Sequence, residues 1–167
     1  GLLIGLVMIA VSACLLGYCV RYDGKHQLYT PLKKLYEDGL AISICPEVFG
    51  GLPTPRASAE IMGGNGDDVL AGRASVVGSD NIDVTQEFIR GAYIALEKIQ
   101  LMNVRLVVLK SNSPSCGSQH IYNGQFDGTL KVGMGVCAAL FKRHHIDILD
   151  ENSPDLIMKI RGYFEKM

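Results

Sequence analysis

The chain has 167 residues, 48% of them apolar, and a formal net charge of −1. This length and composition suit one domain with a substantial hydrophobic core, and a near-neutral chain gives no electrostatic reason to expect binding to nucleic acid or to a membrane surface. The five cysteines do not form a short, closely spaced framework. The sequence therefore disfavours a secreted disulfide scaffold and favours a reducing cytoplasm, where thiols bind metals or take part in catalysis.

The N-terminal segment is apolar but does not resemble a membrane span or a signal peptide. The uncharged stretch is shorter than the roughly 20 apolar residues that a span needs, and the basic start of a signal peptide is missing. We expect a buried first strand at Met8–Cys14 that turns at Gly17. The domain is expected to cover residues 8–167, with residues 1–7 as a cloning remainder or an extension.

The first half of the chain then predicts one helix and two strands. Pro31–Asp38 is expected to be a short helix with proline in its first turn, ended by Gly39. Leu40–Cys45 is a second short apolar run and predicts a buried strand. The stretch 46–66 is rich in glycine and proline and is expected to be mostly loop. Ala74–Gly78 predicts a short strand.

The clearest helical pattern runs from Asp83 to about Met102. Apolar residues recur there at helical spacing on one face, and Asp83 is the expected N-cap. Val104–Lys110 predicts a third buried strand. The stretch 119–130 holds two turn signals of the type Asn-Gly or Asp-Gly and predicts a loop or hairpin.

Three elements complete the expected fold. Gly133–His144 predicts a helix, Ile146–Leu149 a last strand, and Ser153 the cap of a final helix with Pro154 in its first position. Strands that alternate with helices predict an α/β fold. We expect a three-layer, Rossmann-like single domain whose mainly parallel sheet is flanked by helices.

Cys14, Cys45 and Cys116 stand out because each follows a run that predicts a strand. In an open parallel sheet, ligands bind at the carboxyl ends of the strands, so these three thiols are candidates to converge there. Three soft ligands would hold a soft metal or an iron–sulfur cluster and leave one position open for a substrate. The alternative is three core thiols, since cysteine is among the most buried residue types.

Polar residues beside these cysteines have two interpretations each. The candidate roles of Glu47 are metal ligand, general acid or base, and hydrogen-bond anchor, and the alternative is a solvated loop residue. For Ser113, close to Cys116, the candidate roles are a hydrogen bond to a substrate or to a cluster sulfur, or capping of the local backbone. Arg21 is a substrate contact or part of a surface turn.

Other residues complete the list of candidates. Arg56 and Glu60 are expected to pair with each other, and Cys137 is expected to lie in the core of its helix. A zinc site made by the three cysteines and His120 stays open, although structural zinc sites usually show close-spaced ligand pairs.

Five segments of the chain, in order, resemble the thiouracil desulfidase family, long filed as domain of unknown function 523. The resemblance covers about Met8 to Glu151. Its segments are V-S-A-C-L-L-G with R-Y-D-G; C-P-E-V-F-G-G-L-P-T-P-R with A-E-I; D-V-T-Q-E-F-I-R-G-A; S-P-S-C-G with I-Y-N-G-Q-F; and G-M-G-V-C-A-A-L.

The resemblance implies a mainly bacterial, cytoplasmic enzyme that removes sulfur from thiolated nucleobases such as 2-thiouracil. The implied reaction releases sulfide without net redox chemistry. The family holds a 4Fe–4S cluster with one open iron, which implies Cys14, Cys45 and Cys116 as ligands and Glu47 and Ser113 as catalytic helpers. The expected partner is a small thiolated base, not a nucleic acid or a membrane, and the protein is expected to be a monomer or a small homo-oligomer.

This sequence departs from the family pattern at three positions. Cys19 sits one place before a second cysteine of some members, Asn123 replaces a more usual aspartate, and Cys137 replaces a small or hydroxyl residue. None of the three is an implied ligand. Rival interpretations are a zinc-dependent hydrolase of a nucleobase and a non-enzymatic iron–sulfur sensor or sulfur carrier, although no basic recognition helix indicates DNA binding.

Overall fold

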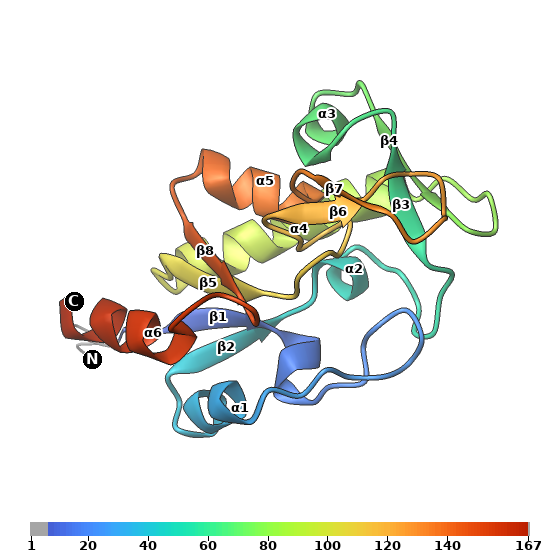
Figure 1. The fold of residues 1–167 in the computed structure, drawn as a ribbon. Coiled ribbons are helices and arrows are strands. Elements are labelled where there is room, and N and C mark those ends of the chain that lie inside the picture. Colours follow the sequence, from blue (N-terminus) through green and yellow to red (C-terminus); the bar gives the residue numbers. More distant parts are fainter. Residues whose placement is uncertain (1–6, 167) are drawn as a thin grey trace.

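A central parallel sheet organises the fold, which was obtained as a computed structural model describing residues 7–166. The expectation for residues 1–7 therefore falls, except at Val7, outside the described residues. The sheet has the strand order β2-β1-β5-β8 (Figure 1). Its members are β1 (Ile9–Ser12), β2 (Ala41–Ile44), β5 (Leu106–Leu109) and β8 (Asp147–Asp150).

Helices cover both faces of this sheet, which confirms the predicted three-layer α/β fold. One face packs on α4 (Thr85–Leu101) and α5 (Val136–Arg143), and the other on α1 (Thr30–Glu37) and α6 (Leu156–Lys166). Side chains of a strand alternate between the two faces. In β5, Val107 belongs to the core under α4 and α5 while its neighbour Val108 belongs to the core under α1 and α6. Within residues 7–166, no helix is both long and apolar enough to cross a membrane.

Strand β1 lies at a point where the chain changes direction across the sheet. It pairs in parallel with β2 on one side, with Ile9 opposite Ala41, and with β5 on the other, with Ala10 opposite Val107. The chain thus continues to one neighbour of β1 and later returns to the other. Such a switch point opens a crevice at the carboxyl ends of the strands, which is where α/β sheets bind ligands.

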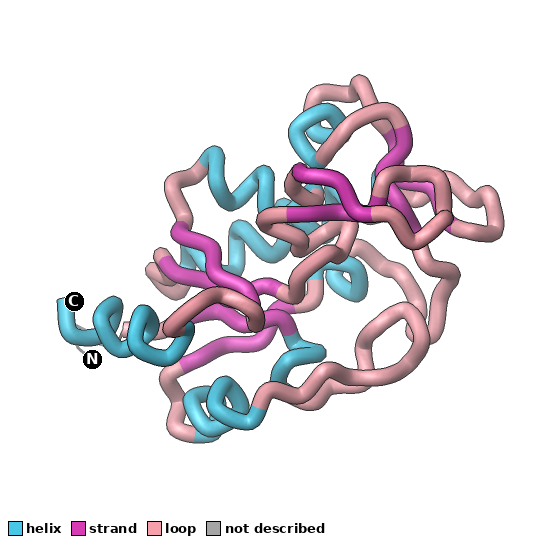
Figure 2. The backbone as a smooth tube through the Cα atoms, viewed as in Figure 1, coloured by secondary structure: helices cyan, strands magenta, loops and turns pink. Residues whose placement is uncertain are grey.

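Two small antiparallel sheets lie beyond that end of the central sheet (Figure 2). One pairs β3 (Ala59–Met62) with β4 (Ser75–Gly78), and the other pairs β6 (His120–Tyr122) with β7 (Leu130–Val132). The hairpin expected at 119–130 is therefore present. A short helix, α3 (Gly66–Leu70), connects β3 to β4.

The expected loop at 46–66 is corrected in two places. It begins with a helix, α2 (Pro46–Phe49), and ends with β3 and the start of α3. A helix of four residues shows no periodicity, and β3 depends on pairing with β4 rather than on its own pattern.

Several element starts and ends also differ from expectation. Helix α5 begins at Val136 rather than at Gly133. The strand predicted through Cys14 ends at Ser12 and continues as a 3-10 helix, η1 (Ala13–Leu16). Helix α4 begins at Thr85 rather than at Asp83, whose carboxylate accepts the Thr85 N–H at 2.8 Å. Helix α6 begins at Leu156, and the hydroxyl of Ser153 instead accepts the Asp150 N–H at 2.9 Å.

Helices α2 and α4 pack so closely that their backbones are in contact, and a glycine lies on each side of the contact. A Cβ atom added at Gly91 would overlap the backbone carbonyl of Pro46, and one added at Gly50 would overlap that of Glu87. Because α2 carries Glu47, this contact fixes the position of that carboxylate relative to the central sheet.

Replacing Gly91 by alanine is expected to destabilise the protein by about 2 kcal/mol, because overpacking against a backbone carbonyl forces the helices apart. Alanine in a helix interior normally stabilises by roughly 1 kcal/mol relative to glycine. Gly162→Ala in α6 is the matched control, since its Cβ atom meets nothing within 4 Å. Urea unfolding should therefore give opposite signs for the two substitutions. Equal stabilisation by both would contradict the close approach.

Candidate active site

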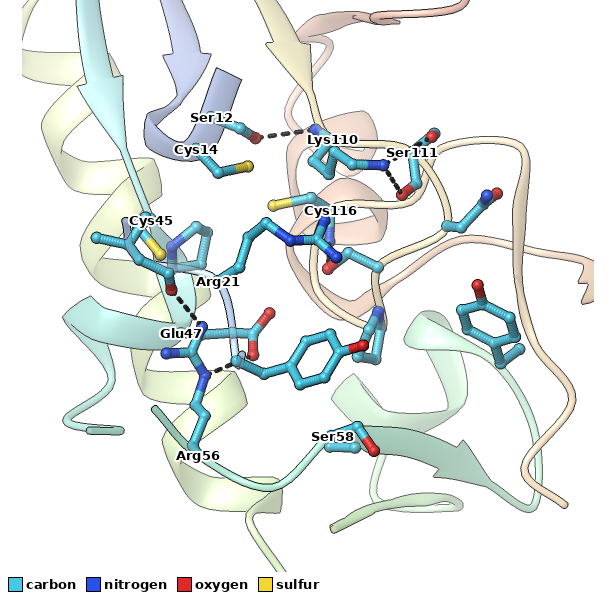
Figure 3. A pocket seen from close by; sticks show the side chains of 18 of the residues that line it. Ser12, Cys14, Arg21, Cys45, Glu47, Arg56, Ser58, Lys110, Ser111 and Cys116 are labelled. Atoms are coloured by element: carbon cyan, nitrogen blue, oxygen red, sulfur yellow. Dashed lines mark hydrogen bonds and ion pairs between the residues drawn. The ribbon is translucent and has the colours of Figure 1, made fainter. Parts of the chain in front are cut away.

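A cavity of about 430 Å³ lies at the carboxyl ends of β1, β2 and β5 (Figure 3). All five site residues predicted from the sequence line it: Cys14, Cys45, Glu47, Ser113 and Cys116. The structure thus brings together side chains from three distant segments. The volume of the cavity falls in the range of about 300–1,000 Å³ that is typical of small-molecule sites.

Each cavity thiol is positioned by the turn that follows its strand. Cys14 lies in η1, whose end at Gly17 requires a left-handed φ of 96° that glycine adopts readily. Cys45 is the N-cap residue of α2. Cys116 lies in a turn after β5, and its N–H donates to Ser113 Oγ at 3.0 Å.

Burial raises the pKa of all three thiols. The pKa of Cys14 reaches about 11, because burial and the neighbouring Cys45 outweigh the opposing charges of Arg21 and Lys110. Burial likewise raises the pKa of Cys45 and, more strongly, that of Cys116. On their own these thiols are protonated at neutral pH, so a soft cation that binds here must displace their protons.

The donor set fits an iron–sulfur cluster better than a single metal ion. Within residues 7–166, no three His, Cys, Asp or Glu side chains are placed to hold one ion. Zinc bonded to thiolates at about 2.3 Å requires sulfurs roughly 4 Å apart, whereas each thiolate of a cluster binds its own iron. His120 is exposed on β6 and does not line the cavity, so the alternative zinc set with His120 is not assembled.

Glu47 is held by a buried arginine. Arg56 Nε donates to Glu47 Oε1 at 3.1 Å, and the Arg56 side chain is only 6% exposed. The other guanidinium nitrogens of Arg56 donate to the carbonyls of Pro53 and Val20 and to the hydroxyl of Thr54. One carboxylate oxygen of Glu47 is thereby fixed, while Oε2 makes no hydrogen bond to any described residue and is available to a ligand.

The expected ion pair between Arg56 and Glu60 is wrong. Glu60 is buried on β3, where Oε1 accepts the N–H groups of Gly124 and Phe126 at 2.9 and 3.2 Å. These bonds tie β3 to the loop between β6 and β7, which also lines the cavity. The two glutamates therefore have different partners because they lie on different elements. Glu47 on α2 points toward Arg56, whereas Glu60 on β3 points toward the β6–β7 loop.

Ser113 caps its own turn and keeps one donor. Its Oγ accepts the N–H groups of Ser115 and Cys116, both at 3.0 Å. Its hydroxyl hydrogen has no acceptor among residues 7–166, and Ser113 lines the cavity. It can therefore cap the backbone and donate one hydrogen bond to a ligand.

A further polar network was not foreseen from the sequence. Lys110 Nζ lies 2.8 Å from Glu151 Oε2, and the Lys110 N–H donates to Ser12 Oγ at 2.9 Å. Burial raises the pKa of Glu151, but hydrogen bonds from Lys110 and from the Ser111 N–H outweigh it and hold that pKa below its usual value of 4.5. The only sequence signal for this network was that Lys110 and Glu151 each directly follow a strand.

Replacing Glu151 by glutamine is expected to cost about 1–2 kcal/mol of stability at pH 7, because it leaves Lys110 without its charged partner. A carboxylate with a lowered pKa contributes stability above its unfolded pKa and loses it as the pH falls through the folded pKa. The stabilities of the wild type and of Glu151→Gln, measured by urea unfolding, should therefore converge as the pH falls through the lowered pKa of Glu151. Glu165→Gln, at an exposed position of α6, should match the wild type at every pH.

The three departures from the family pattern lie outside the cavity lining. Cys19 is exposed, and Cys137 is fully buried in α5, as expected for a core thiol. Asn123 Oδ1 accepts the Gln125 N–H at 2.9 Å within the β6–β7 loop. These substitutions leave the five predicted site residues untouched.

Comparisons with known proteins find relatives over most of the chain. A model of the 2-thiouracil desulfurase family matches residues 9–153. An uncharacterized protein of Bacillus subtilis (strain 168), YbbK, is 46% identical over 145 residues, which is 87% of this chain and 96% of that protein. A solved structure of a 4Fe-4S-dependent thiouracil desulfidase, TudS, is similar with a TM-score of 0.80 and 43% identity, covering 93% of this chain and 98% of that one.

Proposed function

The chain belongs to the 2-thiouracil desulfurase family, and from this we propose that it hydrolyses the carbon–sulfur bond of 2-thiouracil or a similar thiolated base. The thiocarbonyl and water become a carbonyl and hydrogen sulfide, so no atom changes its oxidation state. The observation that carries the proposal is the meeting of Cys14, Cys45, Cys116 and Glu47 in one cavity.

We propose Cys14, Cys45 and Cys116 as the ligands of a 4Fe–4S cluster. Cys19 and Cys137 do not line the cavity, and three protein ligands for four irons leave one iron open. When bound, the cluster supplies a soft Lewis acid for the sulfur of the substrate. An open position favours an enzyme over the rival sensor or sulfur carrier.

Glu47 and Ser113 have complementary roles in this proposal. Glu47 keeps one carboxylate oxygen on Arg56 and uses the other to accept a proton from water as the water oxygen adds to the thiocarbonyl carbon. Glu47 then returns the proton to the departing sulfur or to the ring. Ser113 donates its free hydroxyl hydrogen to the substrate and orients it.

Aromatic side chains make the cavity suitable for a flat ring. Tyr22, Tyr122 and Phe126 all line it, and aromatic faces pack well on planar groups. We therefore infer a free base as the substrate. We propose a bacterial cytoplasm as the place of action, and the exposed free thiol of Cys19 fits a reducing compartment.

The test is anaerobic reconstitution with iron and sulfide, followed by turnover with 2-thiouracil in the absence of any reductant. Uracil and sulfide should appear in equal amounts, and acid-labile sulfide and iron should be present in the protein. A zinc-loaded, iron-free protein that is active on an oxo base would instead support the rival hydrolase.

A further inference from the structure

Three cationic side chains line the cavity, and one of them makes no side-chain hydrogen bond to residues 7–166. Arg56 donates to Glu47, and Lys110 is paired with Glu151. The Nε atom of Arg21 is buried and makes no hydrogen bond to residues 7–166, although it forms an ion pair with Asp23 Oδ1 at 3.6 Å. Buried polar groups in native proteins are nearly always hydrogen-bonded, so a cavity-lining donor without a hydrogen bond is a candidate to bind a ligand.

Hydrogen bonds hold the backbone around Arg21 in place. The Gly24 N–H donates to the Arg21 carbonyl at 2.8 Å and closes a tight turn. Arg56 binds both neighbours of Arg21: its Nη2 donates to the Val20 carbonyl and its backbone N–H to the Tyr22 carbonyl, both at 2.8 Å. A donor on such a fixed segment is preorganised for a ligand.

The guanidinium of Arg21 extends toward the thiols. Figure 3 shows its side chain crossing the space between Cys45 and Cys116. The ring of Tyr22 lies 5.6 Å from the guanidinium carbon. The positive charge also opposes the effect of burial on the pKa of Cys14. Arg21 therefore faces the place where the sulfur of a substrate would lie if these thiols hold the cofactor.

We propose that Arg21 is a further catalytic residue, whose guanidinium binds the substrate's sulfur as negative charge develops on it. This inference rests on the proposed function. The water oxygen bonds to carbon, one water proton passes to Glu47, and Glu47 returns it to the sulfur. The second water proton is released to solvent as the carbonyl forms, and the electrons of the broken carbon–sulfur bonds stay on sulfur, which leaves as hydrosulfide. Arg21 keeps all of its protons, and nothing is oxidised or reduced.

The proposed interaction is stronger in the transition state than in the ground state. A neutral thiocarbonyl is a weak acceptor, whereas hydrosulfide carries a full charge, and charge-assisted hydrogen bonds are about twice as strong as neutral ones. An interaction of this kind raises kcat more than it lowers KM. It also predicts that the product, hydrosulfide, binds to the resting protein through Arg21.

The test compares Arg21→Gln and Arg21→Lys with a surface control, Arg73→Gln, whose side chain is 66% exposed. Rates are normalised to bound iron, and hydrosulfide binding is measured by calorimetry without substrate. Arg21→Gln is expected to lower kcat by about 10²–10³-fold, as when an oxyanion donor is removed, with KM within threefold. Its hydrosulfide affinity should fall at least tenfold, Arg21→Lys should be intermediate, and Arg73→Gln should match the wild type.

Three results would overturn the inference: an unchanged hydrosulfide affinity in Arg21→Gln, a higher KM with an unchanged kcat, or loss of iron from that variant. The last would make Arg21 a structural support of the thiols. A wild-type protein that binds hydrosulfide through Arg21 yet releases no sulfide from thiolated bases refutes the proposed function and leaves the anion site standing.

Discussion

Replacing Cys116 by serine is expected to remove iron and sulfide release together. Cys116 is 6% exposed and lies in the cavity wall with Cys14 and Cys45. A serine hydroxyl is a hard ligand with a very high pKa, so it does not replace a soft thiolate on iron. We expect turnover below about 1% of the wild type, a larger loss than the 10–100-fold typical of residues that only support metal ligands. Iron analysis after anaerobic reconstitution, beside sulfide release, measures both effects.

The matched control for this variant is Cys19→Ser. Cys19 is exposed and does not line the cavity, so its variant should keep full iron content and activity. Far-UV circular dichroism should show that both variants are folded, since serine is close to cysteine in size. An active, iron-loaded Cys116→Ser protein would remove Cys116 from the proposed ligand set.

Replacing Glu47 by glutamine is expected to keep the iron and lose turnover. The amide preserves the size of the side chain and offers Arg56 an oxygen acceptor, but it does not accept a proton from water. Because general acid–base catalysis contributes about 10²–10⁴-fold, kcat should fall by that factor with 2-thiouracil. Steady-state sulfide release by iron-loaded protein provides the measurement.

Glu37→Gln is the matched control, because it removes the same charge from an exposed position of α1. It should leave kcat unchanged. A Glu47→Gln protein with wild-type kcat would exclude Glu47 from proton transfer, whereas loss of iron in that variant would show that Glu47 supports the thiols instead.

The central sheet could be predicted because its strands leave a strong local signal. Every residue of β5 (Leu106–Leu109) is buried, since helices cover both faces, and such strands appear as short continuous apolar runs. The convergence of the thiols then follows from topology alone. Parallel neighbours β2, β1 and β5 end at the same edge, so residues that follow them are brought together however far apart they are in sequence.

The details of the cavity could not be predicted, because they depend on contacts between segments. Helix α2 (Pro46–Phe49) is too short to show a period. Arg56 has glutamates on either side in the sequence, and only the chain path decides that it binds Glu47. Only the folded molecule shows that, of the three cavity cations, Arg21 is the one whose Nε makes no hydrogen bond to residues 7–166. The sequence alone did not distinguish Arg21 from a residue of a surface turn.

The order of strands in the sheet has a consequence for how the protein is made. The N-terminal part of a chain leaves the ribosome first, at about 5–20 residues per second, so Cys14 and Cys45 emerge several seconds before Cys116. Strand β1 lies between β2 and β5, and its second edge stays open until β5 has been synthesised. Cys14 and Cys45 are therefore synthesised well before the third thiol of the cavity. If the three thiols hold a cluster, as proposed, all three ligands are present only after β5 and Cys116 have been made.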